Sequence, residues 1–314
     1  MRWCPEWTWR LRLFLFPRSG DSWLALLRIG LGAQLIGYCW SLGGNWISYF
    51  GGDGDGFVTR RLSEAITESQ SPLVPILSWF VAAADRLGVR DLDTLWFLWW
   101  LLLMAGVFLV VGLASRFAAI TGWLLHLAAS KSGVLLTYGV DELMTIGLFY
   151  LMLSPLPDRF TADARLFGRT SWGKARQLGF WRRVLQLHLC LIYFFGGLAK
   201  ALGRGWWNGD NLWRALTRPP FNVAPPEWIA RFGWALLPTG IAICVIEVGY
   251  PFLIWRGAWR KLWLALVCAM HLGIALLMGL RLFGLVMIVL NLAAFGTPLR
   301  SPRFRLDPSR DALR

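Results

Sequence analysis

Eight apolar runs, most of them close to 20 residues long, are the feature that most limits what this chain can fold into. About 20 apolar residues in a helix are enough to cross the hydrocarbon core of a bilayer. Charged residues make up only 16% of the chain, against about 25% in soluble domains. The sequence therefore predicts an all-α protein, a polytopic transmembrane helix bundle of about eight spans. The runs cover residues 22–42, 94–115, 117–137, 140–157, 184–202, 232–255, 262–280 and 282–297.

The basic residues between the runs indicate how the chain is oriented. If the N-terminus lies inside, the inner segments hold 20 of the 32 Lys and Arg residues, and the outer segments hold 9. Such an excess of positive charge is typical of cytoplasmic loops. We therefore expect both termini in the cytoplasm of a bacterium, with the bundle in its cytoplasmic (inner) membrane. The net charge of +14 follows this loop pattern, so it does not indicate nucleic acid as a partner; membrane lipid is the expected one.

The segments outside the spans divide the chain further. Residues 1–20 alternate Trp, Leu and Phe with Arg, which predicts an amphipathic arm at the membrane interface. Residues 21–299 form one bundle with no visible internal repeat, and 300–314 form a basic cytoplasmic tail. The polar outer loop 43–93 has a short apolar stretch at 73–87 that predicts a re-entrant or surface helix, and its Asp53 and Asp55 predict a turn. The basic inner loop covers 158–183, and a short helix is expected around Asn211 to Thr217.

The run from Gln186 to Gly209 is the one around which we expect the bundle to be organised. Gln186, Tyr193 and Lys200 are spaced by seven residues, so they share one face of a helix. Gly196 and Gly197 lie on or beside that face and permit close approach of another helix or a flat ligand. An ionisable side chain is costly inside a membrane, so Lys200 is a candidate functional residue, although a lysine near a helix C-terminus can also simply reach the interface.

The other ionisable residues in the runs must face the bundle interior. Arg28 is expected to pair with a buried carboxylate or with carbonyls at a helix end, and Lys131 with Asp141 across a tight hairpin. Glu247 needs a cationic partner or a raised pKa, and His271 on the next run is a candidate partner. Each histidine is either a hydrogen-bonded contact between helices or part of a site. These histidines are His126, His188 and His271.

Several chemistries lack any sequence signal. The five cysteines show neither disulfide nor metal spacing, so no metal site is expected. The chain also has no phosphate-binding glycine loop, no serine-hydrolase elbow and no zinc-protease motif.

Several short segments, in order along the chain, are similar to those of the HTTM family, the membrane domain shared with vitamin K-dependent gamma-carboxylase. The segments are LALLRIGLG (24–32), YFGGDGDGF (49–57), YGVDELM (138–144), LSPLPDRF (153–160) and LQLHLCLIYFFGGLAKALGRGWWNG (185–209). The last of them is followed by a run with Glu247 and Pro251, then by His271, and then by Arg281 with Leu282 and Phe283.

The resemblance implies a pocket for reduced vitamin K or a menaquinone-like lipoquinone that faces the extracytoplasmic side. In the carboxylase, a lysine at the position of Lys200 deprotonates the quinol; oxygen then generates a strong base that allows a protein glutamate to be carboxylated. Lys200, Asp141 and His271 are then the catalytic candidates. The carboxylase has a histidine at the position of Asp141 and a second lysine at that of Ala199, and it carries a large lumenal domain. The cofactor-binding candidates are Tyr193, Gly196, Gly197, His188, His126 and Glu247.

Two functions therefore stay open. The first is lyase-like, lipoquinone-dependent chemistry on an extracytoplasmic protein or peptide, or together with a separate soluble subunit. The second is a non-enzymatic lipid- or quinone-binding scaffold subunit. A transporter is a weaker third alternative, because the sequence has no inverted repeat and no paired broken helices.

Overall fold

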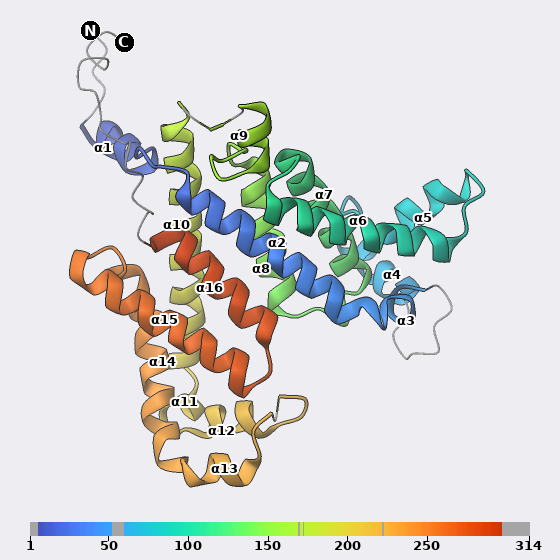
Figure 1. Cartoon of the computed structure of the whole chain (residues 1–314). Helices are drawn as coiled ribbons and strands as arrows, with labels where there is room; N and C mark the ends of the chain where they lie inside the picture. Colours follow the sequence, from blue (N-terminus) through green and yellow to red (C-terminus); the bar gives the residue numbers. More distant parts are fainter. Residues whose placement is uncertain (1–5, 52–59, 169, 172, 222, 297–314) are drawn as a thin grey trace.

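The computed structural model describes residues 6–51, 60–168, 170, 171, 173–221 and 223–296. Within these residues every regular element is an α-helix (Figure 1), as the sequence predicts. The expected turn at Asp53 and Asp55 and the tail 300–314 lie outside the described residues. The helices are α1 (Glu6–Leu15), α2 (Ser22–Gly43), α3 (Trp46–Phe50), α4 (Arg60–Gln70), α5 (Leu77–Asp85), α6 (Asp91–Val111), α7 (Ser115–Ser132), α8 (Gly139–Leu153), α9 (Ala162–Phe167), α10 (Ala175–Ala201), α11 (Arg204–Trp207), α12 (Asp210–Thr217), α13 (Pro226–Arg231), α14 (Gly233–Leu253), α15 (Gly257–Leu277) and α16 (Arg281–Phe295).

Five of these helices are long and apolar enough to cross a membrane: α2, α6, α10, α14 and α15. Each of the other three expected spans also contains a helix, but a less suitable one. Helix α7 has 18 residues, and α8 and α16 have 15 each. Fifteen residues in a helix reach about 22 Å, less than the roughly 30 Å of a hydrocarbon core. Length and composition thus support a membrane protein with five candidate spans.

Helix α10 starts earlier than the apolar run predicts and includes residues 175–183 of the expected inner loop. Arg182 and Arg183 in these turns donate to backbone carbonyls of other segments. Arg182 donates to the carbonyls of Ala294 at 3.0 Å and Gly296 at 3.1 Å, at the end of α16. Carbonyl groups at a helix C-terminus attract a cation, so these first turns of α10 are held against the bundle.

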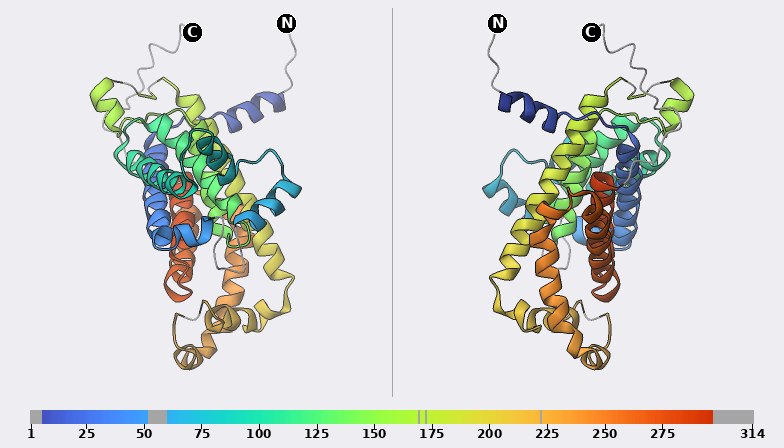
Figure 2. Two further views of the ribbon diagram at one scale, coloured as in Figure 1. Left: turned by 90° about the vertical axis from the view of Figure 1, so that its right-hand side faces the viewer. Right: turned by 90° about the vertical axis from the view of Figure 1, so that its left-hand side faces the viewer.

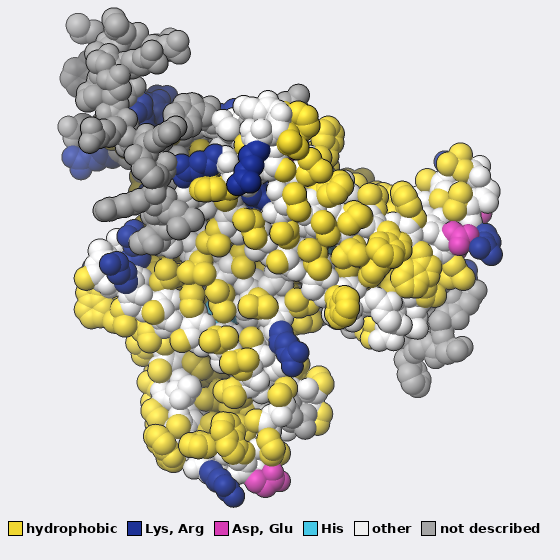
Figure 3. All heavy atoms as spheres, in the orientation of Figure 1, with side chains coloured by type: hydrophobic (Ala, Val, Ile, Leu, Met, Phe, Trp, Pro, Cys, Tyr) yellow, Lys and Arg dark blue, Asp and Glu magenta, His cyan; other side chains and the backbone are white. Residues whose placement is uncertain are grey.

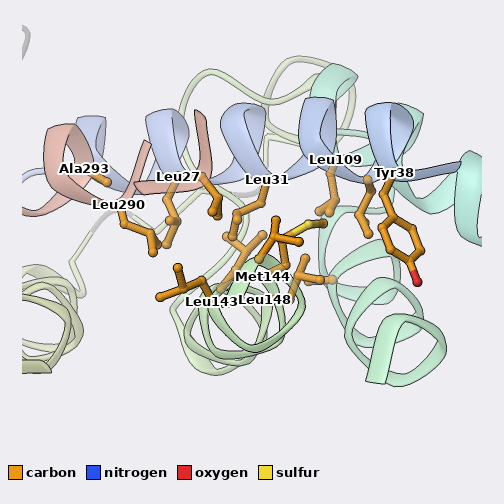
Figure 4. Close-up of a cluster of buried hydrophobic side chains, with 14 of the residues drawn as sticks. Leu27, Leu31, Tyr38, Leu109, Leu143, Met144, Leu148, Leu290 and Ala293 are labelled. Atoms are coloured by element: carbon orange, nitrogen blue, oxygen red, sulfur yellow. The ribbon is translucent and has the colours of Figure 1, made fainter. Parts of the chain in front are cut away.

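The helices are arranged around α2, α8 and α16. Helix α2 packs against α6, α8 and α16, and α10 packs against α14 and α16. Leu27 and Leu31 of α2 point toward Met144 and Leu148 of α8, with Leu290 of α16 beside them (Figure 4). Helices α1 and α9 lie near one end of the molecule, and α11 to α13 lie at the opposite end (Figure 2).

The described parts of the polar loop expected at 43–93 are folded, since α3, α4 and α5 lie in them. Glu64 of α4 accepts hydrogen bonds from the Ser132 hydroxyl at 2.6 Å and from the Ser78 backbone at 3.1 Å. The loop is therefore fastened to the end of α7. The helix expected within 73–87 is α5, and the one expected around Asn211 to Thr217 is α12; both are confirmed.

Apolar side chains cover most of the face seen in Figure 3. Helix α1 also exposes apolar side chains: Trp7, Trp9 and Leu13 are all more than half exposed. The arm is fixed at its base, where the Phe16 ring stacks on Phe180 at 4.8 Å.

Arg28 is a fully buried charged group, since its side chain has no solvent exposure. Its Nε lies 2.7 Å from Asp158 Oδ2, and its Nη1 donates to the carbonyls of Leu109 and of Val110, the latter at 3.0 Å. Both expected kinds of partner, a carboxylate and helix-end carbonyls, are confirmed. The guanidinium thereby joins α2, the end of α6 and the segment after α8.

We expect Arg28→Met to destabilise the protein by about 3–5 kcal/mol, because it leaves the Asp158 carboxylate buried without a counter-ion. Arg90→Met is the matched control: its pair with Asp93 is 83% and 52% exposed, so we expect a change of at most about 1 kcal/mol. Unfolding in mixed micelles titrated with dodecyl sulfate measures both. Equal losses in the two variants would show that the buried pair is not what holds these segments together.

Candidate functional site

The polar face of α10 contacts three other helices. The Gln186 amide donates to the Ala294 carbonyl of α16 at 2.7 Å. Two turns further, Tyr193 bonds to α15 and α16, and two turns beyond that Lys200 bonds to α14. Residues seven apart on a helix are separated by about 10 Å along its axis. The spacing noted in the sequence therefore becomes a polar seam through the bundle interior.

At the end of this seam nearest the C-terminus of α10, Lys200 and Glu247 form an ion pair. Lys200 Nζ lies 2.7 Å from Glu247 Oε2, and the side chains are 29% and 9% exposed. The ammonium also lies 5.8 Å from the centre of the Trp206 ring. Of the two alternatives that the sequence leaves for Glu247, the structure shows a cationic partner, but this partner is Lys200 and not His271. The reason is packing: α14, which carries Glu247, lies against α10.

One level deeper, four side chains from four helices form a buried hydrogen-bonded cluster. The Tyr193 hydroxyl lies 2.7 Å from His271 Nε2 and 2.7 Å from Asn291 Nδ2. The Tyr250 hydroxyl donates to Asn291 Oδ1, also at 2.7 Å. The Tyr193 and Tyr250 rings lie 4.2 Å apart, centre to centre. We call Tyr193, Tyr250, His271 and Asn291 the tyrosine–histidine cluster.

The hydrogen-bond directions in this cluster follow from one backbone group. The Met287 carbonyl can only accept, so the atom 2.8 Å from it must be the amide nitrogen of Asn291. The second hydrogen on that nitrogen points to the Tyr193 oxygen, and Tyr193 then donates its own proton to His271 Nε2. A neutral His271 therefore carries its hydrogen on Nδ1.

That Nδ1 is buried and has no hydrogen-bond partner among the described residues. His271 itself is only 3% exposed. An unmet buried donor costs about 1–3 kcal/mol. The hydrogen bond of His271 to Tyr193 of α10 is thus made, but its Nδ1–H is still available to donate one more.

An apolar cavity of about 500 Å³ lies beside the seam. Helices α12, α13, α14 and α15 line it, and Ile246 and Met270 in its wall immediately precede Glu247 and His271 in the chain. A cavity of this size falls in the range used for small-molecule ligands. Its wall also includes Leu216, Ile229, Ile243 and Ile274.

Gly196 and Gly197 have different surroundings. A Cβ on Gly197 would lie 2.7 Å from both Glu247 Cβ and the Val248 nitrogen, so only glycine lets α14 come this close. A Cβ on Gly196 would lie 3.6 Å from Glu247 Oε2 and 3.7 Å from Lys200 Nζ, which is ordinary contact.

The remaining candidate residues lie elsewhere. Asp141 is 5% exposed and accepts from the Tyr138 backbone at 3.1 Å, so it caps the start of α8. The expected Lys131–Asp141 pair is wrong: Lys131 Nζ bonds to Glu142 at 3.0 Å, because Asp141 is occupied at the helix terminus. His188 Nδ1 lies 2.5 Å from the Tyr150 hydroxyl, between α10 and α8.

His126 belongs to a separate environment between α7, α8 and α2. Its Nδ1 lies 3.1 Å from the Thr145 hydroxyl, and its ring lies 4.9 Å from that of Tyr38. The structure therefore brings together Lys200, Glu247, Tyr193 and His271 along one seam, but not Asp141, His126 or His188.

Sequence reasoning missed Asn291 and Tyr250. A signal was present for Asn291, since it is an amide within an otherwise apolar run. For Tyr250 the only signal is its position three residues after Glu247, on the same side of a helix. Among the described residues no group of three or more His, Cys, Asp or Glu side chains could hold a metal ion.

No family model, curated protein or solved structure matches this chain. The resemblance to the HTTM family therefore rests on the motifs in the sequence.

The two adjacent glycines provide a matched test of the packing around the ion pair. We expect Gly197→Ala to destabilise the protein by about 1–3 kcal/mol, because the new methyl group would overlap α14. Gly196→Ala should change stability by less than about 0.5 kcal/mol, since its methyl group meets only ordinary contacts. Detergent unfolding of both variants makes the comparison, and a similar loss in each would contradict the close approach at Gly197.

Proposed function

We propose that this chain is an integral membrane protein of the HTTM type that binds a lipoquinone-like ligand and performs carboxylase- or lyase-like chemistry with Lys200 as the base. The observation that carries the proposal is the Lys200–Glu247 pair, at 2.7 Å, on the same seam as the buried His271. A base next to a second proton acceptor, close to an apolar cavity, suits removal of a proton from a lipid-soluble molecule.

Two features of the structure fit a quinone. The cavity between α12 and α15 has an almost wholly apolar wall, which suits an aromatic ring system or an isoprenoid chain. The unmet N–H of His271 is a donor for a quinone oxygen. When bound, a reduced quinone would supply the oxidisable hydroxyl group that this chemistry requires.

The chain's own groups can hold and move the proton. As an ion pair, Lys200 carries the proton on Nζ. If that proton passes to Glu247 Oε2, the amine becomes neutral and can accept a proton from a hydroxyl group. The apolar surroundings limit water, which would otherwise compete for the same proton. Tyr193 fixes the orientation of His271 through the 2.7 Å hydrogen bond.

The proposal includes the topology that the charge distribution predicts: about eight spans, both termini in the cytoplasm and the bundle in a bacterial cytoplasmic membrane. Lys200 then lies near the extracytoplasmic face, at the C-terminal end of α10. The substrate would be an extracytoplasmic protein or peptide, presented directly or by a separate soluble subunit.

A second candidate function is a non-enzymatic scaffold that holds a lipid or quinone. The ion pair favours it, because an ammonium held by a carboxylate is a stable structural contact as well as a potential base. The two functions share the cavity and differ in whether Lys200 is needed for turnover.

Lipid extraction tests the cavity. Mass spectrometry of the purified protein should show about one quinone per chain. Gly273→Leu should lose most of it, because Gly273 lines the cavity and has open space where a side chain would project. Gly233→Leu is the control: it also has open space but lies outside the cavity wall. Bulk phospholipid alone in the wild-type sample would overturn quinone binding.

Substitution of the lysine tests the chemistry. We expect Lys200→Ala to reduce oxygen-dependent turnover of reduced 2-methyl-1,4-naphthoquinone by about 100-fold or more, the usual contribution of a general base. Glu247→Gln should reduce it as well, because the pair loses its proton acceptor.

Lys131→Ala is the control for removing a lysine, since its partner Glu142 is 60% exposed and lies on α8. Unchanged turnover in Lys200→Ala would remove the base role. Retained quinone in that same variant would then favour the scaffold.

A further inference from the structure

The sixteen described helices fall into two successive sets of eight with the same order. Each set begins with a short helix (α1, α9) and a long one (α2, α10). Three short helices follow (α3–α5, α11–α13), and then three longer ones (α6–α8, α14–α16). Helices α6 and α14 both have 21 residues, and α8 and α16 both have 15.

The packing repeats along with the order. In the first set α2 contacts α6, α6 contacts α7, α7 contacts α8, and α8 returns to α2. In the second set α10, α14, α15 and α16 form the same closed ring. Helices α3 and α5 contact α6 just as α11 and α13 contact α14.

The contacts between the sets agree with a pseudo-two-fold axis. A two-fold axis that exchanges the sets would place α10 where α2 is and α8 where α16 is. The contact of α16 with α2 therefore requires a contact of α8 with α10, and the structure has both. The contact between α8 and α16 exchanges with itself, so the axis passes between these two helices. Because four long helices return the chain to its starting side, the two units have parallel topology, as in repeats related by an axis along the membrane normal.

The polar residues occupy matching helices as well. Tyr193 of α10, His271 of α15 and Asn291 of α16 correspond by helix to Tyr38 of α2, His126 of α7 and Thr145 of α8. The tyrosine and histidine rings lie 5.9 Å apart at 56° in the second unit, and 4.9 Å apart at 59° in the first. In each unit the histidine has one ring nitrogen bonded to a hydroxyl group and the other nitrogen buried without a partner among the described residues.

Thr145 Oγ1 can donate to His126 Nδ1 or accept from it. When Thr145 donates, the hydrogen of a neutral His126 lies on Nε2, and the free nitrogen is then a donor. His126 has no solvent exposure. One turn before Tyr38, on the same face of α2, Gln34 carries a buried acceptor, Oε1, that is also without a partner.

We propose that the first unit contains a second buried binding site, formed around His126 and Gln34, for the oxygen of a neutral quinone or quinol. It is the pseudo-symmetric counterpart of the His271 site, and its ligand class rests on the proposed function. An oxygen there accepts from His126 Nε2–H, and a hydroxyl group can also donate to Gln34 Oε1. The first unit has no counterpart of the Lys200–Glu247 pair. Among the described residues, the ion pairs of Arg28 on α2 and of Asp91 and Asp93 on α6 do not join α2 to α6. It is therefore a binding site and not a second centre for proton removal.

The chain's three histidines make the test direct. Full-length protein labelled with [¹⁵N]histidine, in lipid bilayers, is titrated with 2-methyl-1,4-naphthoquinone and followed by solid-state NMR. We expect the imidazole signals of His126 and His271 to shift and to saturate. His188, which belongs to neither site, should not move.

The reduced probe is 2-methyl-1,4-naphthoquinol. Gln34→Leu should raise the concentration of this probe that half-saturates the His126 shift about 5- to 10-fold, and it should leave the half-saturation at His271 unchanged. This variant removes an unmet buried acceptor, so it does not endanger the fold.

A shift at His271 alone would overturn the second site and leave the proposed function standing. A shift at His126 alone would support the second site and count against the first. Equal shifts at all three histidines would mean only partitioning into the bilayer, and no shift would overturn both sites.

Discussion

The ion pair between Arg28 and Asp158 is the interaction on which the arrangement of the first helices depends. Both side chains are without solvent exposure, and the guanidinium also reaches the last carbonyls of α6. One group therefore satisfies a carboxylate and a helix end that would each be costly to leave unpaired in an apolar interior. The Asp158 carboxylate accepts from the Phe160 backbone at 2.9 Å, so the turn after α8 is fixed as well. With this end of the bundle fixed, α2 can form a continuous contact surface for α6, α8 and α16.

The polar residues of the second half follow a different principle, because they are distributed along one helix instead of gathered around one charge. Helix α10 presents Gln186, Tyr193 and Lys200 at two-turn intervals. Gln186 bonds to α16, Tyr193 to α15 and α16, and Lys200 to α14. The seam therefore helps to determine which helices lie next to α10. Hydrogen bonds between membrane helices contribute modestly one at a time, about 0.6 kcal/mol on average, so the seam supports specificity of packing more than overall stability.

Much of the fold follows from the sequence alone. The all-helical class, the position of each long helix and the short helices at 77–85 and 210–217 can all be read from apolar periodicity and length. The partners of charged residues are predictable only where one chemical need dominates, as for Arg28. Glu247 shows the limit: its need for a cation is evident, but the cation depends on which helices are neighbours, and no local pattern encodes that. Asp141 shows another limit of prediction from sequence. Its carboxylate accepts a hydrogen bond from the backbone at the start of α8 and does not pair with Lys131.

The short distance within the Lys200–Glu247 pair has a consequence for energy coupling. Moving a unit charge across a whole membrane against 100 mV involves about 2.3 kcal/mol. A proton shifted between two atoms 2.7 Å apart crosses less than a tenth of a hydrocarbon core of about 30 Å, so the same voltage changes its energy by at most about 0.2 kcal/mol. Under the proposed function, proton exchange at this pair is thus nearly indifferent to the membrane potential, and it would run equally well in energised and de-energised cells.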